Sequence, residues 1–198
     1  MSTNIYPIFD TLLGKPEKEK LLNQKGIVIW LIGLSGSGKS TIARALENQL
    51  YKEGNFTQLL DGDNLRTGLN KDLGFSNEDR VENLRRTAET ARLFANSGVI
   101  TICSFITPTE VSRIQIREIL KDLYFEVFVE CPLEECERRD VKGIYAKARK
   151  GEIKNFTGID APFEDPVNPN LVLKTHKDDL ESCLKKLRDS IQSGIKLD

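Results

Sequence analysis

The chain has 198 residues, a length that suits one domain with a sizeable buried core. Hydrophobic residues make up 39% of it and charged residues 30%, which argues against a disordered chain and a membrane-embedded one. The formal net charge of −1 argues against a nucleic-acid-binding protein, so affinity for phosphate must come from local clusters of Lys and Arg.

Residues 1–25 form an N-terminal extension to which the sequence assigns no role, with at most a short helix near residues 17–22. The first residues lack the charged start and apolar stretch of a signal peptide, and no apolar run approaches the roughly 18–20 residues that span a bilayer. The four cysteines have no C-x-x-C spacing, which favours reduced thiols. We therefore expect a cytoplasmic protein without a membrane partner.

Strands and helices are predicted to alternate from residue 26 to residue 198, which we expect to form one domain. The apolar run 27–32 is typical of a strand buried on both faces, and Ser76 to Asp79 has the pattern of a capping box that opens a helix. This alternation predicts an α/β fold, with a mostly parallel sheet covered by helices on both faces. The expected strands are 27–32, 57–60, 99–103, 125–130 and 171–173, and the expected helices are 39–52, 76–95, 110–122 and 178–191; a polar loop is expected at 61–64.

Residues 139–164 interrupt this alternation, because they are dense in charge, contain three glycines and lack a sustained apolar period. We expect this charged segment to be a mobile lid over the nucleotides and not an element of the core.

The sequence from Gly33 to Ser40, GLSGSGKS, fits the P-loop pattern G-x-x-x-x-G-K-[ST] without a mismatch. Its glycines allow backbone N–H groups to point at phosphate oxygens, and the following helix adds its positive N-terminal end. Lys39 should reach the β- and γ-phosphates of ATP, and Ser40 should bind Mg²⁺. The predicted ATP-binding residues are Gly33, Ser35, Gly36, Ser37, Gly38, Lys39, Ser40 and Thr41.

Two further groups of residues predict an acceptor site. Asp61, Asp63 and Arg66 follow a strand, at the edge where open α/β sheets bind ligands. Asp63 is a candidate to orient or deprotonate the acceptor hydroxyl, or to hold Mg²⁺ through water. Arg80 and Asn83 share a helix face, and an arginine in the first turn of a helix suits an anionic ligand better than the helix dipole.

These residues resemble the adenylylsulfate kinase family from Gly26 to about Glu164. The shared motifs are the P-loop through Thr41, DGDNLR at 61–66, LGFS at 73–76, DR at 79–80, NLRR at 83–86, PLE at 132–134, CE at 136–137, RDVKG at 139–143 and FTGIDAPFE at 156–164.

The resemblance implies the P-loop kinase fold and phosphorylation of the ribose 3′-hydroxyl of adenylyl sulfate by Mg-ATP. It implies that Phe75 and Phe163 sandwich the adenine, that Arg66, Arg80 and Asn83 bind polar groups of the substrate, and that Lys142 is a lid lysine. Asp61, Asp63 and Ile106 complete the expected substrate site. Thr107 stands where some members carry a phosphoserine, so it is a candidate phospho-acceptor, although in-line transfer needs no such intermediate.

Two other hypotheses remain open from the sequence: another P-loop small-molecule or nucleotide kinase, and a non-enzymatic subunit that keeps the nucleotide site. The intact set of Lys39, Ser40, Asp63 and Arg80 argues against the second. The resemblance also leads us to expect Mg²⁺ as cofactor, a homodimer, and a separate ATP sulfurylase as a partner enzyme.

Overall fold

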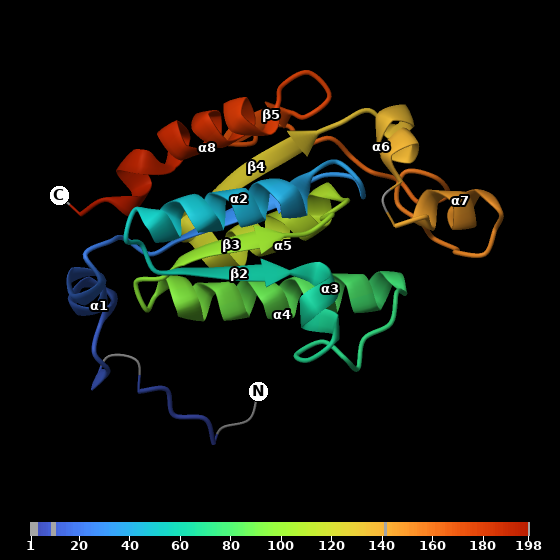
Figure 1. The fold of residues 1–198 in the computed structure, drawn as a ribbon. Helices are drawn as coiled ribbons and strands as arrows, with labels where there is room; N and C mark the ends of the chain where they lie inside the picture. Colours follow the sequence, from blue (N-terminus) through green and yellow to red (C-terminus); the bar gives the residue numbers. More distant parts are fainter. Residues whose placement is uncertain (1–3, 9–10, 141, 198) are drawn as a thin grey trace.

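The computed structural model describes residues 4–8, 11–140 and 142–197. Part of the expected N-terminal extension (1–3 and 9–10) and one residue of the expected lid (Val141) lie outside the described residues, as does Asp198. Five strands form one parallel sheet in the order β2-β3-β1-β4-β5, which confirms the predicted α/β fold (Figure 1). The strands are β1 (Ile27–Ile32), β2 (Thr57–Asp61), β3 (Ile100–Ser104), β4 (Tyr124–Glu130) and β5 (Leu171–Lys174).

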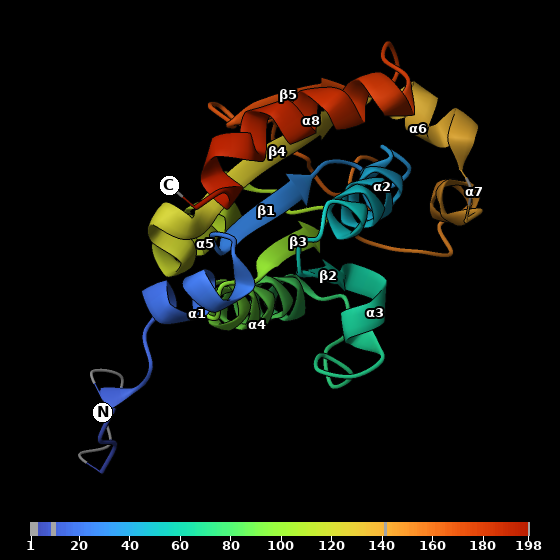
Figure 2. The same ribbon diagram turned by 60° about the vertical axis from the view of Figure 1, so that its left-hand side comes forward.

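Helices cover both faces of this sheet (Figures 1 and 2), so the central strands β3, β1 and β4 are mostly buried between two layers, whereas the edge strands β2 and β5 are partly exposed. Along β1, Ile29 and Leu31 pack toward α2 and α8, whereas the alternate residues Val28, Trp30 and Ile32 pack toward α4 and α5. This two-sided burial explains the unbroken apolar sequence of β1. The helices are α1 (Lys15–Leu22), α2 (Lys39–Lys52), α3 (Gly62–Arg66), α4 (Asn77–Ala95), α5 (Glu110–Leu120), α6 (Leu133–Arg139), α7 (Ile144–Arg149) and α8 (Leu180–Ile195), with a 3₁₀ turn η2 (Lys121–Leu123) after α5.

The predicted strands and long helices are confirmed to within a few residues, and the differences occur at their ends. The expected polar loop at 61–64 is wrong: Asp61 caps the short helix α3, because its carboxylate accepts a hydrogen bond from the backbone N–H of Asp63. The helix expected to reach residue 122 ends at Leu120, where Lys121 adopts a left-handed φ of 49°. The last helix begins later and extends further than predicted, with Asp179 as its N-cap.

The charged segment contains α7 and contributes to a small apolar cluster, contrary to the prediction that it takes no part in a core. Tyr145 is 2% exposed and packs with Cys131 and Cys136 beside the P-loop residue Leu34. The sequence shows no apolar period here because the cluster draws single side chains from several short segments. The other members of the cluster are Leu133, Ile144, Phe156 and Ile159.

The second half of the expected N-terminal extension is tied to the rest of the fold. The side-chain amide of Gln24 donates hydrogen bonds to the carbonyls of Phe56 and Gly98, and the backbone N–H of Gly26 donates to the carboxylate of Glu19 in α1. By contrast, Ile5, Tyr6 and other apolar residues before α1 are exposed. Among the described residues, no helix has the length and apolar character required to cross a membrane.

Candidate active site

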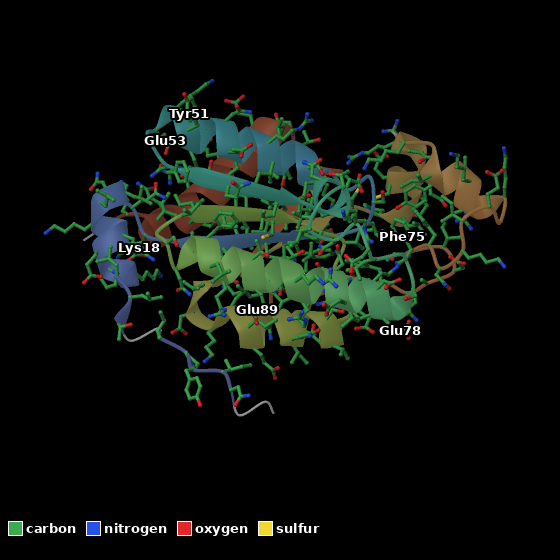
Figure 3. All side chains as sticks on the ribbon, turned by 90° about the horizontal axis from the view of Figure 1, so that it is seen from below. Lys18, Tyr51, Glu53, Phe75, Glu78 and Glu89 are labelled. Carbon is green, nitrogen blue, oxygen red and sulfur yellow. The ribbon has the colours of Figure 1, made fainter. Side chains whose placement is uncertain are left out.

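The predicted functional residues meet at the carboxyl edge of the sheet, the end that faces α3, α6 and α7 in Figure 1. The P-loop follows β1, Asp61 ends β2, and Ser104 ends β3. Because the strands are parallel, residues that follow different strands come to the same edge. Figure 3 shows Phe75 at this end of the molecule, whereas Lys18, Tyr51 and Glu53 lie at the opposite end.

The P-loop backbone has the conformation for which its glycines are required. Gly36 and Gly38 have φ values of 74° and 103°, in the region that residues with a Cβ rarely adopt. At Gly33, a Cβ would lie 2.5 Å from the carbonyl oxygen of Val129 in β4. The glycines therefore serve both the turn and its close approach to the sheet, and α2 begins immediately afterwards at Lys39.

The Lys39 ammonium group is buried against the loop that precedes it. Its Nζ donates hydrogen bonds to the carbonyl oxygens of Gly33 at 2.9 Å and Leu34 at 2.7 Å. Burial lowers the pKa of Lys39 to about 8, and the nearby Cys136 and Asp61 only partly offset this shift. Charge on Lys39 is thus costly in the protein alone and favoured once a polyphosphate lies beside it.

Two hydroxyl groups and two carboxylates lie between the P-loop and α3. Ser40 Oγ is 2.9 Å from Asp61 Oδ2 and 3.2 Å from Ser104 Oγ. Asp63, two residues after Asp61, forms an exposed ion pair with Lys142. Both side chains of this pair are more than half exposed, so solvent screens it and we do not expect it to contribute much stability.

This set of oxygen atoms fits Mg²⁺ bound mainly through water and phosphate. Mg²⁺ prefers oxygen ligands and, at sites shared with nucleotides, takes only one or two of them from the protein. Ser40 with Asp61 or Asp63 supplies that number. Among the described residues, no group of three or more His, Cys, Asp or Glu side chains is arranged to hold a metal, so the protein offers no complete metal cage.

Arg66 and Arg80 form the positively charged side of the site, and both guanidinium groups are bound by neutral partners. Arg66 donates to the carbonyls of Leu73 and Gly74, and Arg80 donates to the carbonyls of Phe75 and Asn155 and to the hydroxyl of Thr157. The pKa of each arginine is lowered, first by burial and, for Arg80, next by the charge of Arg66. Two like charges held close together by backbone oxygens are suited to an anionic ligand.

The two expected adenine-binding phenylalanines have different surroundings. Phe75 is 66% exposed, and its ring lies 4.4 Å from the Arg66 guanidinium carbon. Phe163 is half-buried and stacks on Phe128 with ring centroids 6.1 Å apart. Phe163 also lines a cavity of about 680 Å³ between the end of β4, Leu34 and residues 158–165. That volume is within the range of small-molecule sites.

Of the remaining predicted residues, Asn83 and Thr107 are buried and Ile106 is partly buried. Asn83 is buried, and its Oδ1 accepts a hydrogen bond from the side-chain amide of Asn70. The Ile106 carbonyl accepts from the Gly33 N–H, which joins the loop after β3 to the P-loop. Thr107 is 1% exposed, and its Oγ1 accepts a hydrogen bond from the Trp30 indole at 2.9 Å.

Several residues that contact the P-loop were not singled out from the sequence. Thr175 Oγ1 donates to the Ser37 carbonyl, the Tyr145 hydroxyl donates to the Ser35 carbonyl, and Arg139 reaches the Gly36 and Thr175 carbonyls. The position of Thr175, directly after β5, is a signal that strand-end reasoning could have used. Tyr145 has no comparable signal, because its partner is 110 residues away.

The fold and the site together define a kinase of the P-loop class. The model of the adenylylsulphate kinase family matches residues 25–174. An adenylyl-sulfate kinase of Bacteroides thetaiotaomicron is 57% identical over 193 residues, which cover 97% of this chain and 96% of the relative. One from Clostridium kluyveri is 54% identical over 184 residues, with 93% and 92% covered. The chain therefore belongs to the adenylylsulphate kinase family.

A solved structure agrees with this assignment. The Mycobacterium tuberculosis APS kinase CysC, in complex with AMPPNP and APS, superposes with a TM-score of 0.82 at 46% sequence identity. The match covers 85% of this chain and 98% of that one.

Proposed function

We propose that the protein transfers the γ-phosphoryl group of Mg-ATP to the ribose 3′-hydroxyl of adenylyl sulfate, giving 3′-phosphoadenylyl sulfate and ADP. The observation that carries this proposal is the pair Arg66 and Arg80, held by neutral partners beside the exposed ring of Phe75. An anion next to an aromatic surface is what adenylyl sulfate presents, and a sugar acceptor presents neither group. The relatives and the solved complex support the same assignment.

On the donor side, the ATP-binding residues are those of the P-loop from Gly33 to Thr41. Their backbone N–H groups and the N-terminus of α2 bind the phosphates, and Lys39 balances charge on the group being transferred. Transfer of a phosphoryl group requires mainly positioning and charge stabilisation, so a rigid loop of this kind is sufficient on the donor side.

On the acceptor side, Asp63 pairs with Lys142 and its charge also acts on Lys39 of the P-loop, which supports assigning it to the acceptor hydroxyl. Asp63 orients this hydroxyl or accepts its proton, and Lys142 balances the charge of the carboxylate. Arg66, Arg80 and Asn83 bind the phosphosulfate and polar nucleotide atoms, while Phe75 and Phe163 hold the adenine. Asp61 and Ile106 border the same site.

Ser40 and Asp63 are the proposed Mg²⁺-binding residues, with Asp61 beside them. Bound there with ATP, the ion would neutralise phosphate charge and orient the phosphates. The charged segment 139–164 is the proposed lid of the domain 26–198, since it carries Lys142 and also bonds to Arg80 through Asn155 and Thr157.

We propose that Thr107 has a structural role and does not act as a phospho-acceptor. Its hydroxyl is bound to Trp30, its carbonyl accepts from Arg113, and its φ of 47° is strained for a β-branched residue. Phosphorylation would require this buried arrangement to open. The proposed setting is a homodimer in the cytoplasm, with adenylyl sulfate supplied by a separate ATP sulfurylase.

An acceptor panel tests the reaction. The protein is incubated with Mg-ATP and adenylyl sulfate, AMP, shikimate, gluconate or no acceptor, and ADP and the phosphorylated product are quantified, with EDTA as the metal control. We expect ADP only with adenylyl sulfate, a product phosphorylated at the 3′ position, and no turnover with EDTA. Equal ADP release with another acceptor would favour the alternative, a different P-loop small-molecule or nucleotide kinase.

A further inference from the structure

The P-loop carbonyl groups from Gly33 to Ser37 accept hydrogen bonds from four side chains: Lys39, Arg139, Tyr145 and Thr175. Lys39 donates to the carbonyls of Gly33 and Leu34. The next three carbonyls accept bonds from outside the loop: Ser35 from Tyr145 at 2.9 Å, Gly36 from Arg139 at 3.5 Å, and Ser37 from Thr175 at 2.7 Å. Two of these outside donors belong to the charged segment 139–164: Arg139 at the end of α6 and Tyr145 in α7.

The bond from Tyr145 has a consequence for phosphate binding. A peptide unit is planar and trans, so its C=O and N–H point in opposite directions. The carbonyl of Ser35 and the N–H of Gly36 belong to one peptide unit, and a donor that holds the carbonyl outward keeps this N–H directed inward. Gly36 has a φ of 74°. Because it is a glycine, its backbone can adopt many other conformations unless a contact holds it.

Tyr145 is itself held firmly, although Ala146, Lys147 and Arg149 in the same helix are exposed. The side chain is 2% exposed, and its ring meets the ring of Phe156 edge-on at 5.0 Å. The backbone N–H groups of Tyr145 and Ala146 both donate to the carboxylate of Asp140. Three residues before Tyr145, Lys142 reaches Asp63.

We propose that Tyr145 is a positioning residue that couples the charged segment to the P-loop. When its hydroxyl bonds to the Ser35 carbonyl, the P-loop presents the Gly36 N–H to phosphate. The same contact holds the charged segment so that Lys142 reaches Asp63. The coupling to Lys142 rests on the proposed function, whereas the effect on nucleotide binding requires only the P-loop. Tyr145 does not touch the reacting atoms in this proposal.

The test compares Tyr145→Phe with Tyr124→Phe. Both substitutions remove one partly buried tyrosine hydroxyl that donates a hydrogen bond, and Tyr124 donates to Glu126, outside the site. Binding of Mg-AMPPNP without acceptor is measured by calorimetry, together with melting temperature and the KM values of both substrates. Because the ring and its contact with Phe156 remain, Tyr145→Phe should fold.

We expect Tyr145→Phe to weaken AMPPNP binding about threefold to tenfold, the effect of one net hydrogen bond, and to raise the KM of the acceptor. Tyr124→Phe should retain the wild-type values. Thr175→Val, which removes another bond to a P-loop carbonyl but lies outside the charged segment, should weaken AMPPNP binding and leave the acceptor KM unchanged.

Wild-type AMPPNP affinity in Tyr145→Phe would overturn the inference. A fall in melting temperature with unchanged affinity would do the same, because it would show that the hydroxyl only stabilises the fold. If the wild-type protein failed the acceptor panel, the proposed function would fall, but the AMPPNP comparison would still decide the role of Tyr145 at the P-loop.

Discussion

The proposed donor and acceptor halves of the active site are built in different ways. The donor half is one contiguous stretch, Gly33 to Thr41, in which backbone groups are the main ligands and the carbonyls from Gly33 to Ser37 are all bound. The acceptor half consists of side chains from α3, α4, the loop between them, and the charged segment, several of them exposed. A backbone site has a fixed shape for any nucleoside triphosphate, whereas a side-chain site can be made selective for one acceptor.

The most severe test of the donor half is Lys39→Ala. Lys39 is the only P-loop side chain that supplies positive charge, and we expect its removal to lower kcat by about 1000-fold or more. ADP release at saturating substrates measures this. A rate near that of the wild type would show that the P-loop does not bind the transferring phosphate.

The corresponding test of the acceptor half is Arg80→Ala. Loss of a partly buried charge that binds an anion should lower kcat/KM for adenylyl sulfate about 100-fold and leave the affinity for AMPPNP unchanged. Arg92→Ala is the control, since Arg92 lies on the same helix and pairs with Glu89. If Arg80→Ala and Arg92→Ala had equal acceptor kinetics, Arg80 would not be a substrate-binding residue.

A smaller effect is expected for Phe75→Ala. One stacked base contributes about 2 kcal/mol, so the KM for adenylyl sulfate should rise about 30-fold. Because the ring is 66% exposed, the melting temperature should change little, and circular dichroism measures this. A lower melting temperature without a change in KM would indicate a packing role for Phe75.

The smallest expected effect is the pH dependence of the donor half. The folded pKa of Lys39 is about 8, so kcat/KM for ATP should fall about tenfold at pH 9 as the ammonium loses its proton. In the protein alone, the unfolded chain binds this proton up to its ordinary pKa of 10.5. This group therefore makes the free energy of unfolding rise between pH 8 and 10.5. A pH–rate profile that stays flat to pH 10 would contradict the lowered pKa.

Sequence reasoning succeeded where function and local structure depend on neighbouring residues. The P-loop pattern requires residues within eight positions of one another, and the strand 27–32 and the capping residue Ser76 have local signals of the same kind. The prediction failed for α3 and for the charged segment. In both, single side chains such as Asp61 and Tyr145 determine the structure through contacts that have no periodic pattern.

The sequence alone determined the class of fold, the phosphate-binding loop and the family, because each of these is encoded in contiguous or ordered motifs. Only the tertiary structure revealed that Lys39 is buried against its own loop, that Thr107 is bound to Trp30, and that Tyr145 contacts Ser35. The contacts of Thr107 and Tyr145 join residues that are far apart in the chain and that the fold brings together. Their geometry follows from how the layers pack, and no local pattern of residue types records it.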